Sequence, residues 1–168
     1  MSIAEFDHLP AIQQQELLTQ CCGSANWVDK MLACFPVEDL VELLEYAEEK
    51  WYQCTDQDWL EAFTHHPKIG DLNSLKKEFA DTAEWASDEQ REVAFAGEQI
   101  IRALADANQM YHAKFGYIFI VCATGKTAEE MLTLLEVRLQ NSAEVEIEIA
   151  AGEQDKITKL RLEKLFVS

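Results

Sequence analysis

Residues 87–114, SDEQREVAFAGEQIIRALADANQMYHAK, form the longest stretch of helical periodicity in the chain. Its apolar stripe consists of Val93, Ile100, Ile101, Leu104 and Ala107. The first four residues have the S-x-x-Q form of a capping box, in which side chains satisfy the free N–H groups of a first helical turn. Gly116 follows the last periodic residues and is a typical helix stop. The stretch therefore predicts one long amphipathic helix.

Shorter helical patterns lie on both sides of this stretch, with caps and breaks between them. The predicted helices cover residues 11–20, 26–35, 37–54, 56–66, 71–79, 87–114, 128–141 and 143–166. Pro36 is expected to open the third of these helices, and Thr55 and Thr127 to cap the fourth and the seventh. The run YIFIVCA at residues 117–123 favours a strand but has no partner strand, so we expect a buried connector. The prediction is an all-α chain of about eight helices.

Length and charge limit the domain count and the classes of partner. A chain of 168 residues suits a single domain over residues 1–168. It carries 14 Lys and Arg against 31 Asp and Glu, a formal charge of −17. A surface this acidic repels nucleic-acid phosphates and anionic lipids. We therefore expect no nucleic-acid partner and no membrane partner. An acidic helical interaction module without catalysis is the alternative from another functional class.

The cysteines and the start of the chain indicate the compartment. The five cysteines are Cys21, Cys22, Cys34, Cys54 and Cys122. An odd number without a C-x-x-C pair is not typical of a disulfide framework. The sequence MSIAEFDHLP has no basic segment followed by an apolar run, and no stretch is long enough to cross a bilayer. We therefore expect a cytoplasmic protein.

Common catalytic motifs are absent, and two isolated clusters carry weak signals. Glu61 and His65 stand four apart on one helical pattern and could ligate a metal, but no third ligand is evident, so we expect no metal. Cys122 could pair with a distant histidine as a nucleophile. Its apolar surroundings would raise the pKa of the thiol, which argues against that role.

Three polar residues are better candidates for chemistry. His66 precedes Pro67, which stops the helix and holds the imidazole on a stiff turn, and histidine moves protons near neutral pH. Glu89 stands in the first turn of the long helix, where unpaired N–H groups bind anions. Arg161, among leucines of the last helix, could clamp a carboxylate with its planar fork. The structural alternatives are a loop histidine, a glutamate that stabilises its helix, and a surface arginine.

These segments together resemble the 2-oxo-4-hydroxy-4-carboxy-5-ureidoimidazoline (OHCU) decarboxylases. The resembling segments are HHPKIGD at 65–71, SDEQ at 87–90, N-x-x-Y-x-x-K-F-G at 108–116, YIFIVCA at 117–123, R-L-x-N at 138–141 and K-I-x-x-L-R-L at 156–162. They follow the expected order and cover essentially the whole chain. HHPKIGD is closer to the bacterial form of the motif than to the animal form.

The resemblance implies an all-α, cofactor-free enzyme of urate degradation that converts OHCU into (S)-allantoin and CO2. It places His66, Glu89 and Arg161 at the catalytic positions. The positions it implies for substrate contact are Pro67, Ala86, Ser87, Asp88, Glu89, Gln90 and the backbone of Ile118, Phe119, Ile120, Val121 and Cys122. His66 then either contacts the 4-hydroxyl proton or donates the proton that sets the (S) centre. The family is commonly dimeric, so a homodimer is expected.

Overall fold

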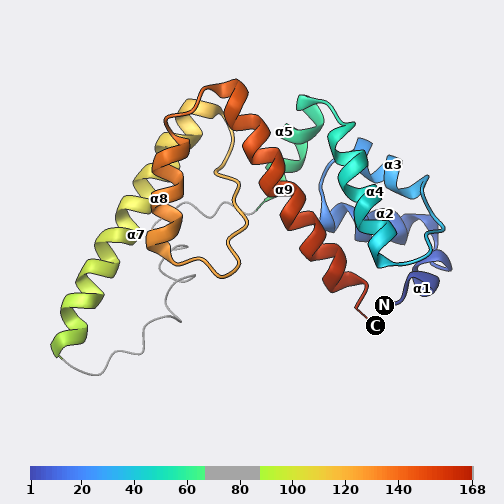
Figure 1. Cartoon of the computed structure of the whole chain (residues 1–168), viewed down its shortest axis with the longest axis horizontal. Helices are drawn as coiled ribbons and strands as arrows, with labels where there is room; N and C mark the ends of the chain where they lie inside the picture. Colours follow the sequence, from blue (N-terminus) through green and yellow to red (C-terminus); the bar gives the residue numbers. More distant parts are fainter. Residues whose placement is uncertain (67–87, 168) are drawn as a thin grey trace. The chain divides into compact units, whose positions relative to one another are not determined.

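The computed structural model describes residues 1–66 and 88–167, and side chains within this part except those of residues 88–96. In that part the chain forms eight helices and no strand (Figure 1). They are α1 (Ile3–Asp7), α2 (Ala11–Cys21), α3 (Ala25–Leu32), α4 (Leu40–Tyr52), α5 (Asp56–Thr64), α7 (Asp88–Phe115), α8 (Ala128–Arg138) and α9 (Ala143–Leu165). The all-α prediction is confirmed. The predicted helix at 71–79 lies outside the described residues, and α1 was not predicted.

Side-chain caps fix where most helices begin. Thr55 accepts a hydrogen bond from the Asp58 N–H at the start of α5, and Thr127 accepts one from the Glu130 N–H at the start of α8. Both predicted caps are therefore confirmed. The prediction that Pro36 opens a helix was wrong, because α4 begins only at Leu40, where the Asp39 carboxylate caps the first turn.

The helix predicted at 26–35 was also too long at its end. Helix α3 stops at Leu32, and Ala33 forms its C-cap. Cys34 and Phe35 therefore lie beyond the helix, although they continue its apolar periodicity. The ring of Phe35 packs 4.7 Å from that of Phe6, so the pattern reflects burial outside the helix.

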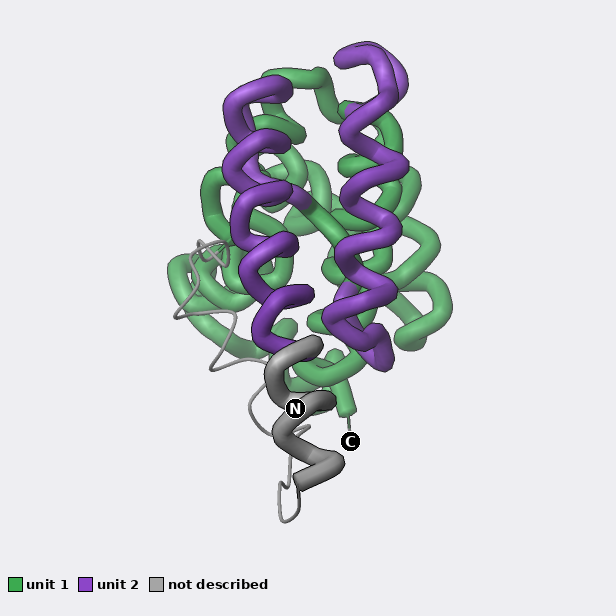
Figure 2. Tube along the Cα trace, turned by 90° about the vertical axis from the view of Figure 1, so that its left-hand side faces the viewer, with its two compact units in different colours: residues 1–66, 120–122, 147–168 green, residues 67–119, 123–146 purple. Residues whose placement is uncertain are grey.

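The chain divides into two compact units, and each is described by itself (Figure 2). Unit 1 comprises residues 1–66, 120–122 and 147–168. Helix α3 packs against α2, α4 and α5 in this unit. Its core contains two tryptophans whose indoles also join elements, because Trp27 donates to the Ala47 carbonyl at 3.0 Å and Trp51 donates to the Ala151 carbonyl at 2.8 Å. Trp51 thereby ties α4 to α9, the helix that carries Arg161.

Unit 2 comprises residues 67–119 and 123–146, and within it α7 packs along α8 (Figure 2). Gly116 ends α7 with a φ of +82°, a left-handed conformation that glycine adopts without steric cost. Residues 117–123 then form neither helix nor strand, as expected of a connector. Of the helices described, none combines the length and apolar character needed to cross a bilayer.

Candidate functional site

His66 is placed by the end of α5. The helix stops at Thr64, His65 forms the C-cap, and the His66 N–H donates to the Phe63 carbonyl at 3.3 Å. The imidazole is half-buried in unit 1, and its Nε2 forms a short hydrogen bond with Oε1 of Gln154 from α9. The predicted histidine is therefore held by a specific side chain and is not a freely rotating surface group.

Gln154 belongs to a buried polar chain that the sequence reading missed. Its side-chain Nε2 donates to Oγ1 of Thr158 at 3.0 Å, and Gln154 is only 1 % exposed. Thr158 is hydrogen-bonded in turn to the thiol of Cys22, which is fully buried. Burial raises the pKa of Cys22 to about 12, so the chain is neutral at physiological pH.

Arg161 follows Thr158 on the same face of α9, since positions 154, 158 and 161 have helical spacing. Its Nη1 donates to the backbone carbonyls of Gln20 at 3.4 Å and Cys21 at 3.3 Å. These carbonyls belong to the last turn of α2, where the helix leaves acceptors unpaired. Arg161 is thus oriented by the end of α2, and within residues 1–66 and 88–167 no other hydrogen bond of its guanidinium is found.

Three effects set the protonation of His66. Burial lowers the pKa of His66 most strongly, and electrostatic interaction with Arg161 and with the adjacent His65 lowers it further. The hydrogen bond to Gln154 acts in the opposite direction. The net pKa of His66 lies below its ordinary value, so the imidazole is neutral at pH 7 and able to accept a proton.

Gly23 permits the close approach of the histidine pair to the α2–α3 connection. A Cβ placed on Gly23 would lie 2.3 Å from Cγ of His65, which is closer than two carbon atoms can approach. Residues 21–24 are all buried beneath this contact. Sequence reading did not single out Gly23 as part of the site; the available signal was a glycine inside a short connection between two apolar helices.

The remaining predicted site residues divide among three parts of the chain. Pro67, Ala86 and Ser87 lie outside the described residues. Asp88, Glu89 and Gln90 form the first turn of α7 in unit 2, as predicted for the backbone, but their side chains are not described. Ile118 and Phe119 belong to unit 2, and Ile120, Val121 and Cys122 belong to unit 1. Of the three catalytic candidates, the structure brings His66 and Arg161 together.

Unit 2 contains a second buried polar arrangement, centred on Glu146. Its Oε1 receives hydrogen bonds from the Tyr111 hydroxyl at 2.5 Å and from Nε of Arg138 at 2.7 Å, and its Oε2 receives one from Nδ2 of Asn141 at 3.0 Å. The Arg138 guanidinium also stacks 4.5 Å from the ring centre of Phe119. Tyr111, Arg138 and Asn141, which all belong to the resembling motifs, thus bind Glu146 within unit 2. Through Arg138 they also contact Phe119 of the 117–123 connector.

The suggested metal pair has a structural explanation. Oε1 of Glu61 accepts a hydrogen bond from the Ala25 N–H at 2.6 Å, at the start of α3. His65 packs on Gly23 as described above. The described residues contain no group of three His, Cys, Asp or Glu side chains able to hold a metal ion.

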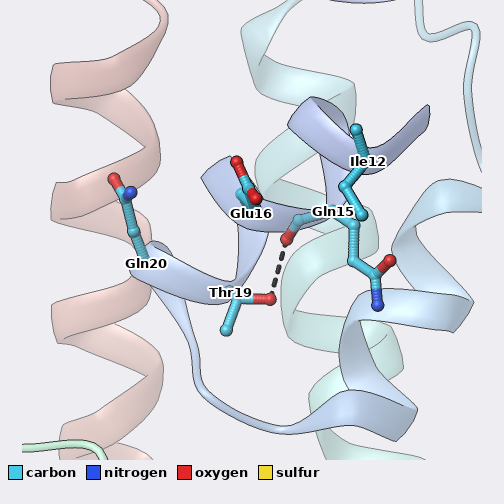
Figure 3. Close-up of a pocket in the computed structure, with 5 residues that line it drawn as sticks. All are labelled: Ile12, Gln15, Glu16, Thr19 and Gln20. Carbon is cyan, nitrogen blue, oxygen red and sulfur yellow. Dashed lines mark hydrogen bonds between the residues drawn. The ribbon is translucent and has the colours of Figure 1, made fainter. Parts of the chain in front are cut away.

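A hollow of about 400 Å³ lies along α2 (Figure 3). Its lining residues are Ile12, Gln15, Glu16, Thr19 and Gln20, which form one face of the helix. None of them was a predicted site residue. Gln20 connects the hollow to the site region, because its carbonyl accepts the hydrogen bond from Arg161.

Comparison with known proteins agrees with the resemblance in the sequence. The family model described as OHCU decarboxylase matches residues 7–163. The uric acid degradation bifunctional protein TTL of Arabidopsis thaliana is 41% identical over 149 residues, which are 87% of this chain and 45% of that protein. The 2-oxo-4-hydroxy-4-carboxy-5-ureidoimidazoline decarboxylase of Xenopus laevis is 30% identical over 108 residues, 61% of this chain and 58% of that protein.

A crystal structure of OHCU decarboxylase in the presence of (S)-allantoin matches with a TM-score of 0.69 and 38% identity, and covers 88% of this chain and 95% of that one. This chain spans about half the length of the curated relatives just described. The family model matches nearly all of the chain. The chain therefore belongs to the OHCU decarboxylase family.

Proposed function

We propose that this protein decarboxylates OHCU to (S)-allantoin and CO2. The observation that carries the proposal is the half-buried His66, neutral at pH 7 and held by Gln154, with Arg161 oriented on the same helix as that glutamine. This arrangement places a proton acceptor and a fixed cation in one unit. A carboxylate substrate that must exchange a proton needs both.

The substrate itself supplies the electron sink for the reaction. In OHCU the carboxylate is attached to ring C4, next to a C5=N double bond. When the C4–carboxyl bond breaks, its electron pair forms a C4=C5 double bond and the ring nitrogen takes the negative charge and then a proton. Loss of the 4-hydroxyl proton and protonation of C5 give the C4 carbonyl of allantoin and its (S) centre. The reaction consumes one proton overall, and the residues proposed here orient the substrate and exchange protons.

The site residues are proposed in distinct roles. The nitrogens of Arg161 not bonded to the α2 carbonyls bind an anionic or carbonyl oxygen of the substrate. Glu89 accepts hydrogen bonds from ureido or ring N–H groups. Pro67, residues 86–90 and the backbone of residues 118–122 supply further contacts. His66 exchanges the proton at the 4-hydroxyl or at C5.

Stereochemistry provides the test of this activity. OHCU generated in situ from urate decays spontaneously to racemic allantoin, so a rapid circular dichroism signal on addition of the protein reports enzymatic (S)-allantoin formation. His66→Gln should reduce that rate about 100-fold or more, the usual contribution of general acid–base catalysis. His112→Gln, at an exposed histidine in the last turn of α7, is the matched control and should keep the full rate.

Two outcomes would contradict the proposal. A wild-type protein that leaves the decay racemic is not a decarboxylase of OHCU, and the acidic interaction module then accounts better for the chain. Full rate and stereochemistry in His66→Gln would instead remove His66 from the mechanism and leave the activity itself standing.

Variants of Glu89 and Arg161 test whether these residues act in substrate binding rather than in the chemical step. Glu89→Gln keeps the size of the side chain and removes its charge, so a role in binding N–H groups predicts a raised KM. Arg161→Lys keeps the charge and loses the planar fork, so it should also raise KM. Because Arg161 bonds the end of α2, its variant needs a parallel unfolding curve to show that the fold is retained.

Domain organisation, assembly and location complete the proposal. The family match over residues 7–163 supports one catalytic domain over residues 1–168. We further propose a homodimer in the cytoplasm. Sedimentation at micromolar concentration should give about twice the 19.2 kDa chain mass, and a monomer that is fully active would contradict the dimer.

A further inference from the structure

We propose that Gln154 is a positioning residue that holds His66 in its Nε2–H tautomer and leaves Nδ1 as the atom that accepts a proton from the substrate. This inference rests on the proposed function. It goes beyond it by naming the reacting nitrogen and the residue that selects it.

The direction of the hydrogen-bonded chain determines the tautomer. Cys22 keeps its proton, and its sulfur is hydrogen-bonded to the Thr158 hydroxyl. If that hydroxyl donates its one hydrogen to the sulfur, its lone pair receives the hydrogen from Nε2 of Gln154, at 3.0 Å. The amide oxygen of Gln154 then faces His66 and can only accept, so Nε2 of His66 must carry the hydrogen. In a neutral imidazole the other nitrogen, Nδ1, is then a lone-pair acceptor.

Burial keeps this chain from reorienting. Gln154, Thr158 and Cys22 are 1 %, 3 % and 0 % exposed, so water cannot replace any of their hydrogen bonds. If the amide were reversed, every hydrogen bond of the chain would reverse with it, and the thiol of Cys22, a weak donor, would have to donate to Thr158. In the orientation observed, the stronger hydroxyl donor of Thr158 faces the sulfur instead. The direction of the chain therefore follows from the Thr158–Cys22 hydrogen bond.

An amide is better suited to this position than a carboxylate. Among the described residues, the charged and titratable groups that act on His66 are Arg161 of α9 and the adjacent His65. A carboxylate at position 154 would add an anion in direct contact with the ring and stabilise its cation. Gln154 orients the ring without adding charge, and so leaves His66 neutral and basic.

The proton path follows from this tautomer. The 4-hydroxyl proton of OHCU moves to Nδ1 of His66 as the C4–carboxyl electron pair forms the C4=C5 double bond, the C5=N pair moves onto the ring nitrogen, and CO2 leaves. The imidazole is then an imidazolium that retains its Nε2–H bond to Gln154. Return of the Nδ1 proton to the substrate regenerates the neutral imidazole, and the second proton, the one that the reaction consumes overall, comes from solvent. Of the two roles left open by the sequence, the structure assigns His66 the contact with the 4-hydroxyl first.

Nitrogen NMR tests the tautomer without reference to activity. In protein labelled with ¹⁵N histidine, the His66 spectrum at neutral pH should show a protonated Nε2 and an unprotonated Nδ1. Gln154→Met, which has similar volume and no amide, should convert this to a mixture of tautomers. A wild-type His66 protonated on Nδ1, or an unchanged tautomer in the variant, would overturn the proposal whatever the enzyme does.

Kinetics test whether the tautomer matters for the reaction. Gln154→Met should lower kcat about 10- to 100-fold, because a reacting group misplaced by about 1 Å can lose about 100-fold in rate, with KM changed much less. Gln154→Glu should raise the pKa of His66 and move the acidic limb of the kcat–pH profile to higher pH by about one unit or more. A merely structural role would lower stability and leave that limb in place.

A matched control and the separate outcomes complete the experiment. Gln53→Met and Gln53→Glu make the same changes at an exposed glutamine in the C-cap of α4, and both should keep the wild-type kcat and pH profile. An unmoved limb in Gln154→Glu, with the fold intact, overturns the positioning role. Failure of the proposed function would be observed differently: the wild-type protein would give no circular dichroism signal of (S)-allantoin.

Discussion

Each of the two units buries a group of hydrogen-bonded polar side chains. The two groups differ in their charge and in how many of their polar atoms are hydrogen-bonded. In unit 1 the chain from His66 through Gln154 and Thr158 to Cys22 is neutral. In unit 2 the carboxylate of Glu146 lies in a full ion pair with Arg138, with Nη2 of the arginine at 2.6 Å from Oε1.

This difference separates a structural cluster from a reactive one. Both oxygens of Glu146 are hydrogen-bonded, and burial together with the bond to Glu146 raises the pKa of Tyr111 far above its usual value. Within the described residues, the two carboxylate oxygens are thus taken up by donors, and the Tyr111 hydroxyl keeps its proton at pH 7. Among the described residues, only one ring nitrogen of His66 is hydrogen-bonded, and its pKa is lowered, so the other nitrogen can accept a proton near pH 7.

Removing the central carboxylate of unit 2 should have the largest effect on stability. Glu146→Ala removes a buried carboxylate that pairs with the guanidinium of Arg138, a residue that is 6 % exposed. Breaking a buried pair on one side costs about 3–5 kcal/mol. We expect that loss in the free energy of unfolding from urea titration.

A double variant distinguishes the lost ion pair from simple loss of volume. Replacing both partners, Arg138→Met with Glu146→Leu, should recover much of the stability, since apolar pairs of similar volume often replace buried ion pairs at little cost. Glu144→Ala, at an exposed glutamate two residues earlier, should cost less than about 1 kcal/mol. Equal losses for Glu144→Ala and Glu146→Ala would show that the cluster contributes nothing specific.

A methyl group on Gly23 should disturb the position of His65 and His66 in unit 1. In Gly23→Ala the new Cβ meets His65 at 2.3 Å, so either the α2–α3 connection or the histidine pair must move. Overpacking of this kind costs about 1–3 kcal/mol. Because His66 is the next residue, we also expect a lower kcat, which Gly97→Ala should not show, since no atom lies within 4 Å of a Cβ at Gly97. Full activity in Gly23→Ala would mean that His65 does not help to place His66.

Sequence reading recovered the elements whose signals are local. The caps Thr55 and Thr127, the long helix that ends before Gly116 and the last helix up to residue 165 all follow from periodicity and cap chemistry within one stretch. Its errors at Pro36 and at Cys34 have different causes. A proline often occupies a first helical position, but here the Asp39 cap starts α4 only at Leu40. At Cys34, apolar spacing reports which residues pack inward, and the partly buried Cys34 and Phe35 continue that spacing past the point where Ala33 ends the helix.

The contacts of the candidate site could not be predicted, because they join distant positions. His66 and Gln154 are 88 residues apart, and Arg161 lies about 140 residues from the carbonyls it bonds. Nothing in the local sequence distinguishes Gln154 from an exposed glutamine. The family resemblance supplied His66, Glu89 and Arg161, and the structure adds the residues that orient two of them.

Two equivalent helix caps, one in each unit, allow the units to be compared with variants that lose less unfolding free energy than those above. Thr55 begins α5, which ends at the histidine pair, and Thr127 begins α8, which leads to Arg138. Alanine at either position removes a capping box and should cost about 1 kcal/mol of unfolding free energy. Thr55→Ala should also lower kcat slightly through His66, whereas Thr127→Ala should not. Equal kinetic effects of both variants would show that α5 does not specifically support the site.

The smallest expected effect is the pH dependence of stability that His66 contributes. Because the folded pKa of His66 lies below its unfolded value near 6.5, the unfolded chain binds more protons as the pH falls past about 6.5. Stability from this residue is therefore complete above about pH 6.5 and is lost as the pH falls through the folded pKa. The pKa of Tyr111 is raised from its ordinary value, so this hydroxyl keeps its proton in that range. His66→Gln should thus flatten the slope of unfolding free energy between about pH 5 and 7, and an unchanged slope would place the imidazole in water rather than against Gln154.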